Sequence, residues 1–376
     1  MSGVTAIDLH NITSSEEVAN IIETSATALM NNPGLATSLP AIMLRGAPGV
    51  GKSTIVRSVA EKLGIGFIDI RLAQMERVDF AGLPSVENGV TEWNVPSFWP
   101  RDMKSKGIIL LDEITSAPSD CQVAAYSVVL DRRIPNSNYV LPNGWLIVAA
   151  GNRTCDRAVV KTMSSALANR FVHFEVEANA EDWVKWATKN NINPAVVGFI
   201  NYRPGLLFKM EGQNLEQGWP SPRSWERVSN SIKMFENNSN ILRKVIYGLI
   251  GNGAGLEFME FYKMSSKFDS ILAIMLDEKK EFELPSKADE RYAVASAVVY
   301  HMWNGNNEDE HITRVNGFYK ILKKMPSDFA SMMIRSAMLG NKNVTALDAI
   351  RLIMTNKNYH EAAKNLNKII QDVGSL

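Results

Sequence analysis

A glycine-rich segment carrying one lysine has the spacing of a phosphate-binding loop. GAPGVGKS (46–53) fits the pattern Gly-x4-Gly-Lys-Ser, follows the apolar run AIMLR (41–45) and opens a helix-like stretch. Glycines expose main-chain amides to phosphate oxygens, and a helix N-terminus adds positive potential. Lys52 can then reach the terminal phosphates, and the Ser53 hydroxyl can bind Mg²⁺. The residues expected to bind nucleotide are Gly46, Ala47, Pro48, Gly49, Val50, Gly51, Lys52, Ser53 and Thr54.

Two adjacent carboxylates follow another apolar run. GIILLDEI delivers Asp112 and Glu113 at the end of an expected buried strand. There Asp112 can hold hydrated Mg²⁺, while Glu113 orients and deprotonates a water molecule. By themselves these residues could form an acidic turn, but the upstream loop favours the paired-carboxylate interpretation. We expect the loop and the acid pair to follow neighbouring strands and to converge on one magnesium-bound triphosphate.

Three further polar residues extend the candidate site, and each has a simpler alternative. Asn152 ends WLIVAAGN and can hold the attacking water, although Gly-Asn-Arg is also a turn sequence. Arg170 precedes FVHFEVE and can neutralise transition-state charge, or can be an exposed surface arginine. Arg223 in SPRSW starts an expected helix, where it can contact phosphate or bind nothing.

Short apolar runs alternate with helix-like segments through the first half, which predicts a parallel sheet covered by helices. Between the first two runs, STIVRSVAEKLG is expected to form a helix that ends at Gly64. Beyond about residue 178 amphipathic helical segments dominate, separated by polar loops at 277–290 and 304–311. The expected strands are residues 41–45, 66–72, 107–111, 145–150 and 171–177.

Composition predicts a globular protein of more than one core. The 376 residues include forty basic and forty acidic side chains, so net charge gives no support for binding nucleic acid. The first twenty residues lack a signal-peptide pattern and no apolar stretch is long enough to span a bilayer, so we expect a cytoplasmic protein without membrane contact. Cys121 and Cys155 are expected to be buried thiols, and the scattered histidines predict no metal centre.

Two turn-bearing segments lie beside the core strands. VENGVTEW carries Asn88-Gly89 between strand-like stretches within residues 79–100, which predicts a β-hairpin. RRIPNSNYVLPNG (132–144) precedes the expected strand at 145–150 and carries a second turn signal. Both can be ordinary surface hairpins, with Trp93, Phe98 and Trp99 packing locally.

These motifs and their order resemble the AAA+ superfamily over roughly residues 35 to 240. In that resemblance 46–53 is Walker A, 107–113 is Walker B, and Asn152 is sensor 1. It implies that Arg170 is an arginine finger acting in trans and that Arg223 is sensor 2. It further implies ATP and Mg²⁺ as cofactors, ATP hydrolysis to ADP and phosphate, and a homo-hexameric ring.

The segment 79–100 looks like the helix-2 insert of MoxR-type ATPases, and 132–144 looks like their hairpin before sensor 1. The resemblance implies chaperone-like remodelling or activation of a protein client, with a von Willebrand A domain protein as a possible partner. The corresponding domains are an α/β nucleotide-binding core (1–177), a helical lid with sensor 2 (178–240) and a C-terminal helical domain (241–376).

Three other classes of nucleotide-binding protein fit the sequence less well. A DNA motor or loader is an alternative because related clades with the same insert, including MCM helicases, translocate on DNA, although the neutral charge argues against it. A small-molecule nucleotide kinase shares the GAPGVGKST loop but leaves Glu113 and Asn152 unexplained. A GTPase is disfavoured because no Asn-Lys-x-Asp motif is present.

Overall fold

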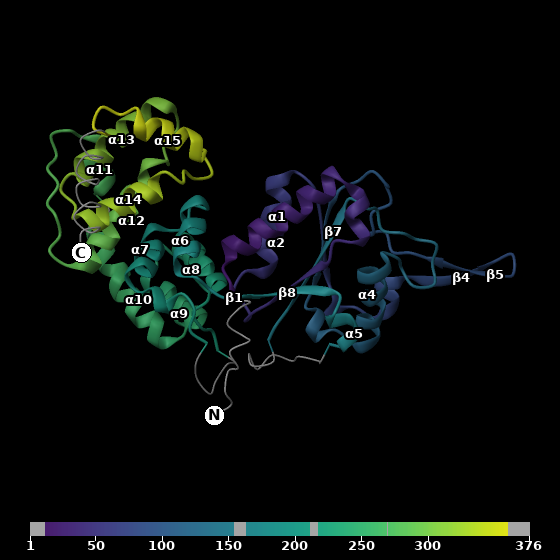
Figure 1. Cartoon of the computed structure of the whole chain (residues 1–376). Helices are drawn as coiled ribbons and strands as arrows, with labels where there is room; N and C mark the ends of the chain where they lie inside the picture. Colours follow the sequence, from purple (N-terminus) through teal and green to yellow (C-terminus); the bar gives the residue numbers. More distant parts are fainter. Residues whose placement is uncertain (1–11, 154–162, 211–216, 269, 360–376) are drawn as a thin grey trace, which may run out of the picture. The chain divides into compact units, whose positions relative to one another are not determined.

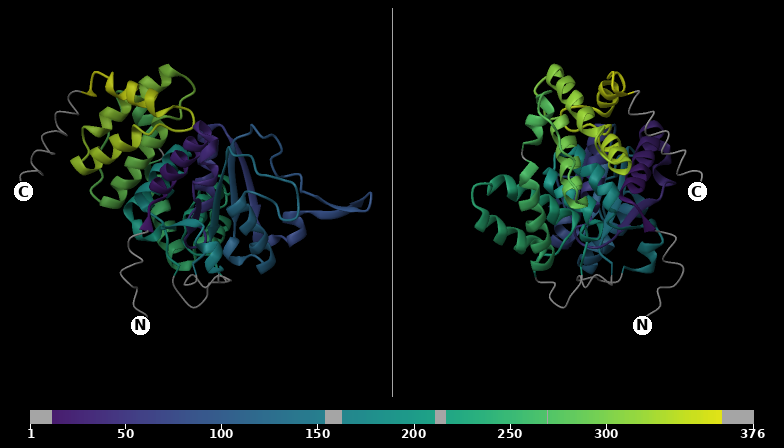
Figure 2. Two further views of the ribbon diagram at one scale, coloured as in Figure 1. Left: turned by 45° about the vertical axis from the view of Figure 1, so that its right-hand side comes forward. Right: turned by 90° about the vertical axis from the view of Figure 1, so that its left-hand side faces the viewer.

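The computed structural model describes residues 12–153, 163–210, 217–268 and 270–359 (Figures 1 and 2). The chain divides into two compact units, residues 1–178 and 179–376. Each unit contains its own hydrophobic core. The predicted boundary at residue 240, within the second unit, stays a prediction.

A six-stranded parallel sheet forms the centre of the first unit, in the order β1-β8-β2-β7-β6-β3. The α/β fold class is therefore confirmed, and all five expected strands are present with ends within one residue of those predicted. The two-residue β1, which pairs with β8, was not predicted. The strands are β1 (Ile12–Thr13), β2 (Ala41–Arg45), β3 (Gly66–Arg71), β6 (Gly107–Asp112), β7 (Trp145–Gly151) and β8 (Phe171–Val176).

Helices cover both faces of this sheet, which explains the continuous apolar runs of its central strands. Ile109 and Leu111 of β6 pack in one cluster with Cys121 of α4, while α1 and α2 lie on the other side (Figure 1). Cys121 is thus buried, as predicted, whereas Cys155 lies outside the described residues. Helix α2 ends at Gly64 in the left-handed conformation, as predicted. The helices of this unit are α1 (Ser15–Asn31), α2 (Lys52–Leu63), α3 (Arg77–Ala81), α4 (Ser119–Asp131) and α5 (Ser165–Ala168).

The strand order corrects one expectation about the site. The glycine loop follows β2 and the acid pair follows β6, but β7 lies between these two strands. The prediction that they are neighbours was wrong, because sequence order does not reveal which later strand inserts between two earlier ones. The C-terminal ends of three adjacent strands therefore contribute to the site, and β7 brings Asn152 into the middle.

The predicted hairpin at Asn88-Gly89 is present as β4 (Leu83–Glu87) and β5 (Val90–Asn94). Both turn residues have positive φ, 52° and 76°, as a two-residue hairpin turn requires. The ribbon extends away from the rest of the first unit (Figures 1 and 2). Its Val86 is 74% exposed, so the ribbon offers apolar surface to solvent.

The second expected hairpin, at 132–144, is reduced to a single antiparallel bridge between Arg133 and Val140. The segment is held instead by Arg132, whose Nη2 donates to the carbonyl oxygens of Pro142 and Trp145, each at 2.8 Å. Burial lowers the pKa of this arginine to about 10. The buried guanidinium thus adds to the few main-chain bonds across this segment, such as that from the Leu141 amide to the Arg132 carbonyl at 2.7 Å.

The three aromatic residues within and just after the ribbon differ in their burial. Trp99 is 1% exposed, and its indole nitrogen donates to the Phe80 carbonyl at 3.0 Å. Its ring contacts those of Phe98 and Tyr139, with centroids 5.2 and 6.0 Å away. Trp99 and Phe98 therefore pack locally, the simpler alternative for these residues, whereas Trp93 on β5 is half-buried.

The described part of the second unit contains helices and no strands, as predicted for the chain beyond about residue 178. The predicted loop at 304–311 is shorter than expected, because the Asn307 side chain caps α13 and residues 308–311 are already helical. No helix in the described part of either unit is long and apolar enough to cross a membrane. The helices are α6 (Ala180–Lys189), α7 (Pro194–Tyr202), α8 (Pro222–Met234), α9 (Ser239–Ile250), α10 (Asn252–Ser265), α11 (Ile271–Leu276), α12 (Ala288–Met302), α13 (Glu308–Leu322), α14 (Ser327–Ala337) and α15 (Ala346–Met354).

Candidate nucleotide site

The glycine loop turns directly from β2 into α2. Gly49 and Gly51 have φ values of 85° and 98°, a region that side chains other than hydrogen disfavour. The residue before the helix, Gly51, has no side chain that could cap the first turn of α2. The amides at the start of α2 are therefore available to an anion, and the helix dipole favours negative charge there.

Lys52 is buried, with 8% of its surface exposed, and its ammonium group lies inside the loop. Its Nζ donates to the carbonyl oxygens of Gly46 at 2.7 Å and Ala47 at 3.1 Å. A third contact, 3.3 Å long, reaches Oδ1 of Asn152 at the end of β7. One cation thus connects the glycine loop with the strand next to it.

Ser53 and Asp112 meet across the sheet edge. The Ser53 hydroxyl donates to Oδ2 of Asp112 over 2.6 Å, joining the start of α2 to the end of β6. A hydroxyl and a carboxylate are hard oxygen donors of the kind that bind Mg²⁺ beside nucleotide phosphates. This pair, together with the Lys52 ammonium, fits a magnesium-bound nucleotide.

Glu113 follows Asp112 in a left-handed conformation, with φ 57° and ψ 28°. Its amide donates to Oδ1 of Asp112 over 2.9 Å, which fixes the carboxylate that faces Ser53. A non-glycine residue with positive φ is uncommon, and such strain often occurs at functional sites. The turn takes the chain out of β6 into the short 3₁₀ helix η4 (Ile114–Ser116) and leaves the Glu113 side chain exposed.

Thr115 positions the end of β7, a role that the sequence analysis missed. Its Oγ1 accepts a hydrogen bond from the main-chain N–H of Asn152 at 3.1 Å. A Cβ on Gly151 would lie 2.6 Å from Oγ1 and from Cγ2 of Thr115, so only glycine permits this approach. The one sequence signal was a hydroxyl residue two positions after Glu113.

Replacement of Gly151 by alanine should therefore move Asn152. The new methyl group must displace Thr115 and break the Asn152 amide contact, because 2.6 Å is far inside normal van der Waals distance. We expect the free energy of unfolding to fall by about 1–3 kcal/mol, with a larger loss of ATP turnover than of nucleotide affinity. Thermal unfolding and steady-state kinetics measure both. Gly205→Ala in the second unit, where an added Cβ meets nothing within 4 Å, is the control.

A second acidic residue lies beside the candidate magnesium pair. Asp69 on β3 is joined to Arg57 of α2 by a 3.5 Å ion pair, and its Oδ1 is buried without a hydrogen-bond partner. Burial, and next the negative charge of Asp112, raise the pKa of Asp69. Arg71, the register partner of Asp112, and Arg57 both oppose this shift. The candidate site is therefore flanked by acids and arginines on the α2 side of the sheet.

Arg170 lies at the opposite end of the parallel strands from the glycine loop. It precedes β8, whose first residue Phe171 is in register with Ala41 at the start of β2. The glycine loop follows the other end of β2, about 13 Å further along at roughly 3.3 Å per residue. Arg170 donates from Nη1 to the Ala166 carbonyl at 2.9 Å, and its guanidinium lies 4.9 Å from the Tyr126 ring centroid. The structure thus does not bring Arg170 to the loop of its own subunit.

Arg223 belongs to the second unit, where it is an exposed residue of the first turn of α8. The preceding Ser221 caps this helix by accepting a hydrogen bond from the Ser224 amide at 3.2 Å. Its predicted contact with phosphate stays a prediction.

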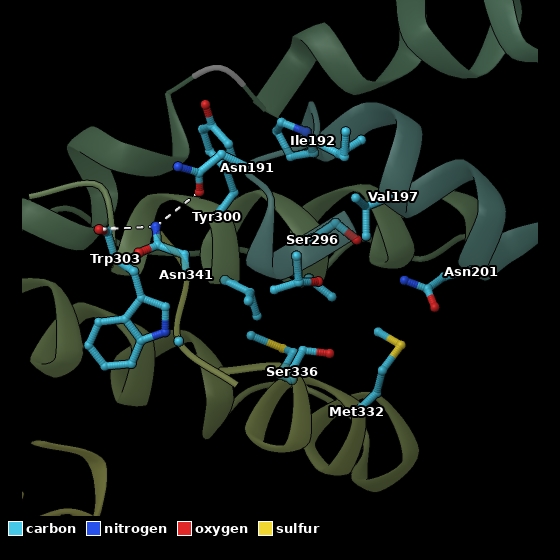
Figure 3. Close-up of a pocket in the computed structure, with 16 residues that line it drawn as sticks. Asn191, Ile192, Val197, Asn201, Ser296, Tyr300, Trp303, Met332, Ser336 and Asn341 are labelled. Atoms are coloured by element: carbon cyan, nitrogen blue, oxygen red, sulfur yellow. Dashed lines mark hydrogen bonds between the residues drawn. The ribbon is translucent and has the colours of Figure 1, made fainter. Parts of the chain in front are cut away.

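A cavity in the second unit is lined by α6, α7, α12, α14 and the loop before α15 (Figure 3). Its volume of about 30 Å³ is far below the size of a nucleotide site. The Asn341 amide at its rim donates to Oδ1 of Asn191 at 3.0 Å and to the Trp303 carbonyl at 3.3 Å (Figure 3). These bonds tie loops together, so the cavity is a packing feature of the helical core.

Comparison with known proteins agrees with the geometry of the first unit. Residues 41–171 match the family described as AAA domain (dynein-related subfamily). The match includes the glycine loop, Asp112, Glu113, Asn152 and Arg170. A stretch of 102 residues, 27% of this chain, is 31% identical to Lon protease of Metamycoplasma arthritidis (strain 158L3-1) and spans only 12% of that protein.

Solved structures match a larger share of this chain than the sequence relative does, but at lower sequence identity. The RuvB Holliday junction branch migration motor of Thermotoga maritima is 15% identical with a TM-score of 0.36, and the alignment covers 89% of this chain and 86% of that one. NtrX of Brucella abortus is 14% identical with a TM-score of 0.35, and that alignment covers 82% of this chain and 67% of NtrX. Such low values support no inference about activity. The fold class, an α/β AAA+ P-loop NTPase core followed by a helical region, follows from the strand order and the matched domain.

Proposed function

We propose that this chain, whose residues 41–171 match the AAA domain (dynein-related subfamily), hydrolyses ATP to ADP and phosphate with Mg²⁺. The observation that supports this most strongly is the pair of contacts that join three strand ends. Lys52 reaches Asn152, and Ser53 reaches Asp112, at 3.3 and 2.6 Å. Such convergence serves phosphate chemistry, in which catalysis depends on positioning and charge neutralisation.

Each residue then has a distinct task. The amides of the glycine loop and the Lys52 ammonium bind the phosphates, and Ser53 and Asp112 hold the metal, the latter through water. When bound there, Mg²⁺ would neutralise part of the phosphate charge. Glu113 takes the proton of the attacking water, and the neutral Asn152 amide holds that water without adding charge. Thr115 and Gly151 keep Asn152 in place.

Completion of the site calls for a second copy of the chain. Arg170 lies at the opposite end of β2 from the glycine loop, which supports a role for its guanidinium at the site of a neighbour rather than at its own. This supports a ring in which each subunit supplies an arginine to the next, and we infer a homo-hexamer from the resemblance to AAA+ proteins. Arg223 acts in the same proposal as a sensor of nucleotide state in the helical unit.

Arg170→Ala should leave ATP bound and lower turnover by about 10³-fold, the effect of an arginine finger. Assembly and nucleotide affinity should be retained, as measured by analytical ultracentrifugation and fluorescent-nucleotide titration. A 1:1 mixture of Arg170→Ala and Lys52→Ala subunits should recover part of the activity, because an intact loop then meets an intact arginine. Arg133→Ala, an exposed arginine of the same unit, is the control. Full activity of the Arg170 variant would exclude the finger role.

The client of the proposed machine is a protein. The exposed β4–β5 ribbon, with Leu83, Val86 and Val90 each at least 60% exposed, offers apolar surface that can engage a polypeptide. By resemblance we propose a MoxR-like ATPase that remodels or activates its client, with a von Willebrand A domain protein as a candidate partner. The balanced charge of the chain supports a protein client over nucleic acid.

Purified protein tests the proposal directly. Incubation with ATP and Mg²⁺ should release phosphate without transfer to AMP, which separates an ATPase from a nucleotide kinase. Addition of single- or double-stranded DNA should leave the rate unchanged at low salt. Stimulation by DNA that weakens as salt increases would favour a DNA motor instead. Absence of hydrolysis at any protein concentration would reject the ATPase itself.

A further inference from the structure

The C-terminal end of β8 contacts the segments that follow two of the strands at the phosphate site, β2 and β7. Arg45, the last residue before the glycine loop, is in register with Glu175. A Cβ on Gly46 would lie 2.4 Å from the Val176 carbonyl oxygen, so the loop begins directly against the β8 main chain. Movement at the start of the loop must therefore displace the end of β8.

Arg153 makes the second connection to this end of β8. It directly follows Asn152, and its Nη1 lies 2.6 Å from Oε1 of Glu175 and 3.5 Å from Oε1 of Glu177. The two glutamates are two residues apart, as expected for side chains on the same side of an extended chain. The side chains of Arg153 and Glu175 are only 23% and 29% exposed, so this pair is less screened than a surface pair.

The same segment continues into the helical unit. The first unit ends at Ala178, one residue after Glu177, and the second begins at Asn179. Asn179 caps α6, because its Oδ1 accepts a hydrogen bond from the Asp182 amide at 3.0 Å. The chain that leaves the Arg153 ion pairs therefore reaches the cap of α6 within two residues.

We propose that Arg153 is a positioning residue that transmits the state of the phosphate site to the helical unit. Its partners are Glu175 and Glu177, and its neighbour Asn152 contacts Lys52. A shift of Asn152 on binding or losing the terminal phosphate moves Arg153, which pulls or releases the end of β8. The proposal rests on the ATPase function proposed above and adds a physical link between that site and the second unit.

Removal of the Arg153 ion pairs should leave nucleotide binding nearly unchanged but remove the response of the helical unit. We expect Arg153→Ala to keep the dissociation constant for ADP and the KM for ATP within about twofold of the parent, and to lower kcat about tenfold. Spin labels on Glu61→Cys of α2 and Glu226→Cys of α8 report the distance between units, with Cys121→Ala and Cys155→Ser removing native thiols. The parent should change this distance between ADP and a non-hydrolysable ATP analogue. Arg153→Ala should not.

Matched variants test the ion pairs themselves. Arg153→Glu combined with Glu175→Arg should restore the distance change that Arg153→Glu alone removes. Lys62→Ala breaks a 2.8 Å ion pair with Glu23 elsewhere in the same unit and should alter neither readout. If Arg153→Ala does not fold by circular dichroism, Glu177→Gln removes the longer ion pair alone and should reduce the distance change.

The outcomes separate this inference from the proposed ATPase. A parent protein without ATP turnover rejects the ATPase and the inference with it. A parent that hydrolyses ATP but shows no change in distance between the units overturns the inference alone. An Arg153→Ala variant that retains the change, or that loses nucleotide binding altogether, also overturns it, because Arg153 is then either dispensable or part of the binding site.

Discussion

Glu113→Gln should bind ATP with nearly unchanged affinity and hydrolyse it at least about 10²-fold more slowly. Glutamine keeps the length and polarity of the side chain but cannot accept the proton of the attacking water. The Ser53–Asp112 contact and the Lys52 contacts do not involve the Glu113 carboxylate, so the binding residues should stay in place. Single-turnover hydrolysis and fluorescent-nucleotide titration measure the two effects separately.

The same variant also offers a route to the client. A ring that binds ATP without hydrolysing it should hold what it has engaged, so affinity purification with ATP should recover client and partners together. Glu61→Gln, an exposed acid on α2, is the matched control and should turn over ATP at the parental rate. If Glu113→Gln hydrolyses ATP at the parental rate, another group is the base.

The five longer strands of the sheet and the ribbon were predictable because local sequence determines them. GIILLD is apolar at every position before its last, since β6 is buried on both faces, and this is the signature of a central parallel strand. Asn88-Gly89 predicted the β4–β5 hairpin because few residue pairs accept positive φ at both turn positions. The order of motifs along the chain then indicated the fold class. Each of these inferences needs only residues that are close in sequence.

What could not be predicted depends on contacts between distant segments. The insertion of β7 between β2 and β6, and the pairing of the two-residue β1 with β8, follow from tertiary packing. Thr115 drew no prediction from the sequence, because its bond to the Asn152 main-chain amide spans 37 positions. The segment 132–144 had hairpin turn signals, but burial of Arg132 against two carbonyl groups determined its shape. In each case a long-range contact outweighed local preference.

Lys52→Ala should have the largest effect on nucleotide binding, weakening it by about 2–5 kcal/mol, or roughly 30- to 4,000-fold, the range for removing one partner of a buried charged pair. The ammonium is the buried cation that contacts both the loop carbonyls and Asn152, so its loss removes phosphate attraction and leaves the carbonyls of Gly46 and Ala47 without their donor. Isothermal titration with ATP and with ADP measures the effect, which should be larger for ATP because the lysine is expected to reach the terminal phosphate. Lys62→Ala, in the last turn of the same helix, should bind both nucleotides normally. Parental affinity of the Lys52 variant would mean that the glycine loop is a structural turn, and the assignment of Asp112 to the metal would lose its support.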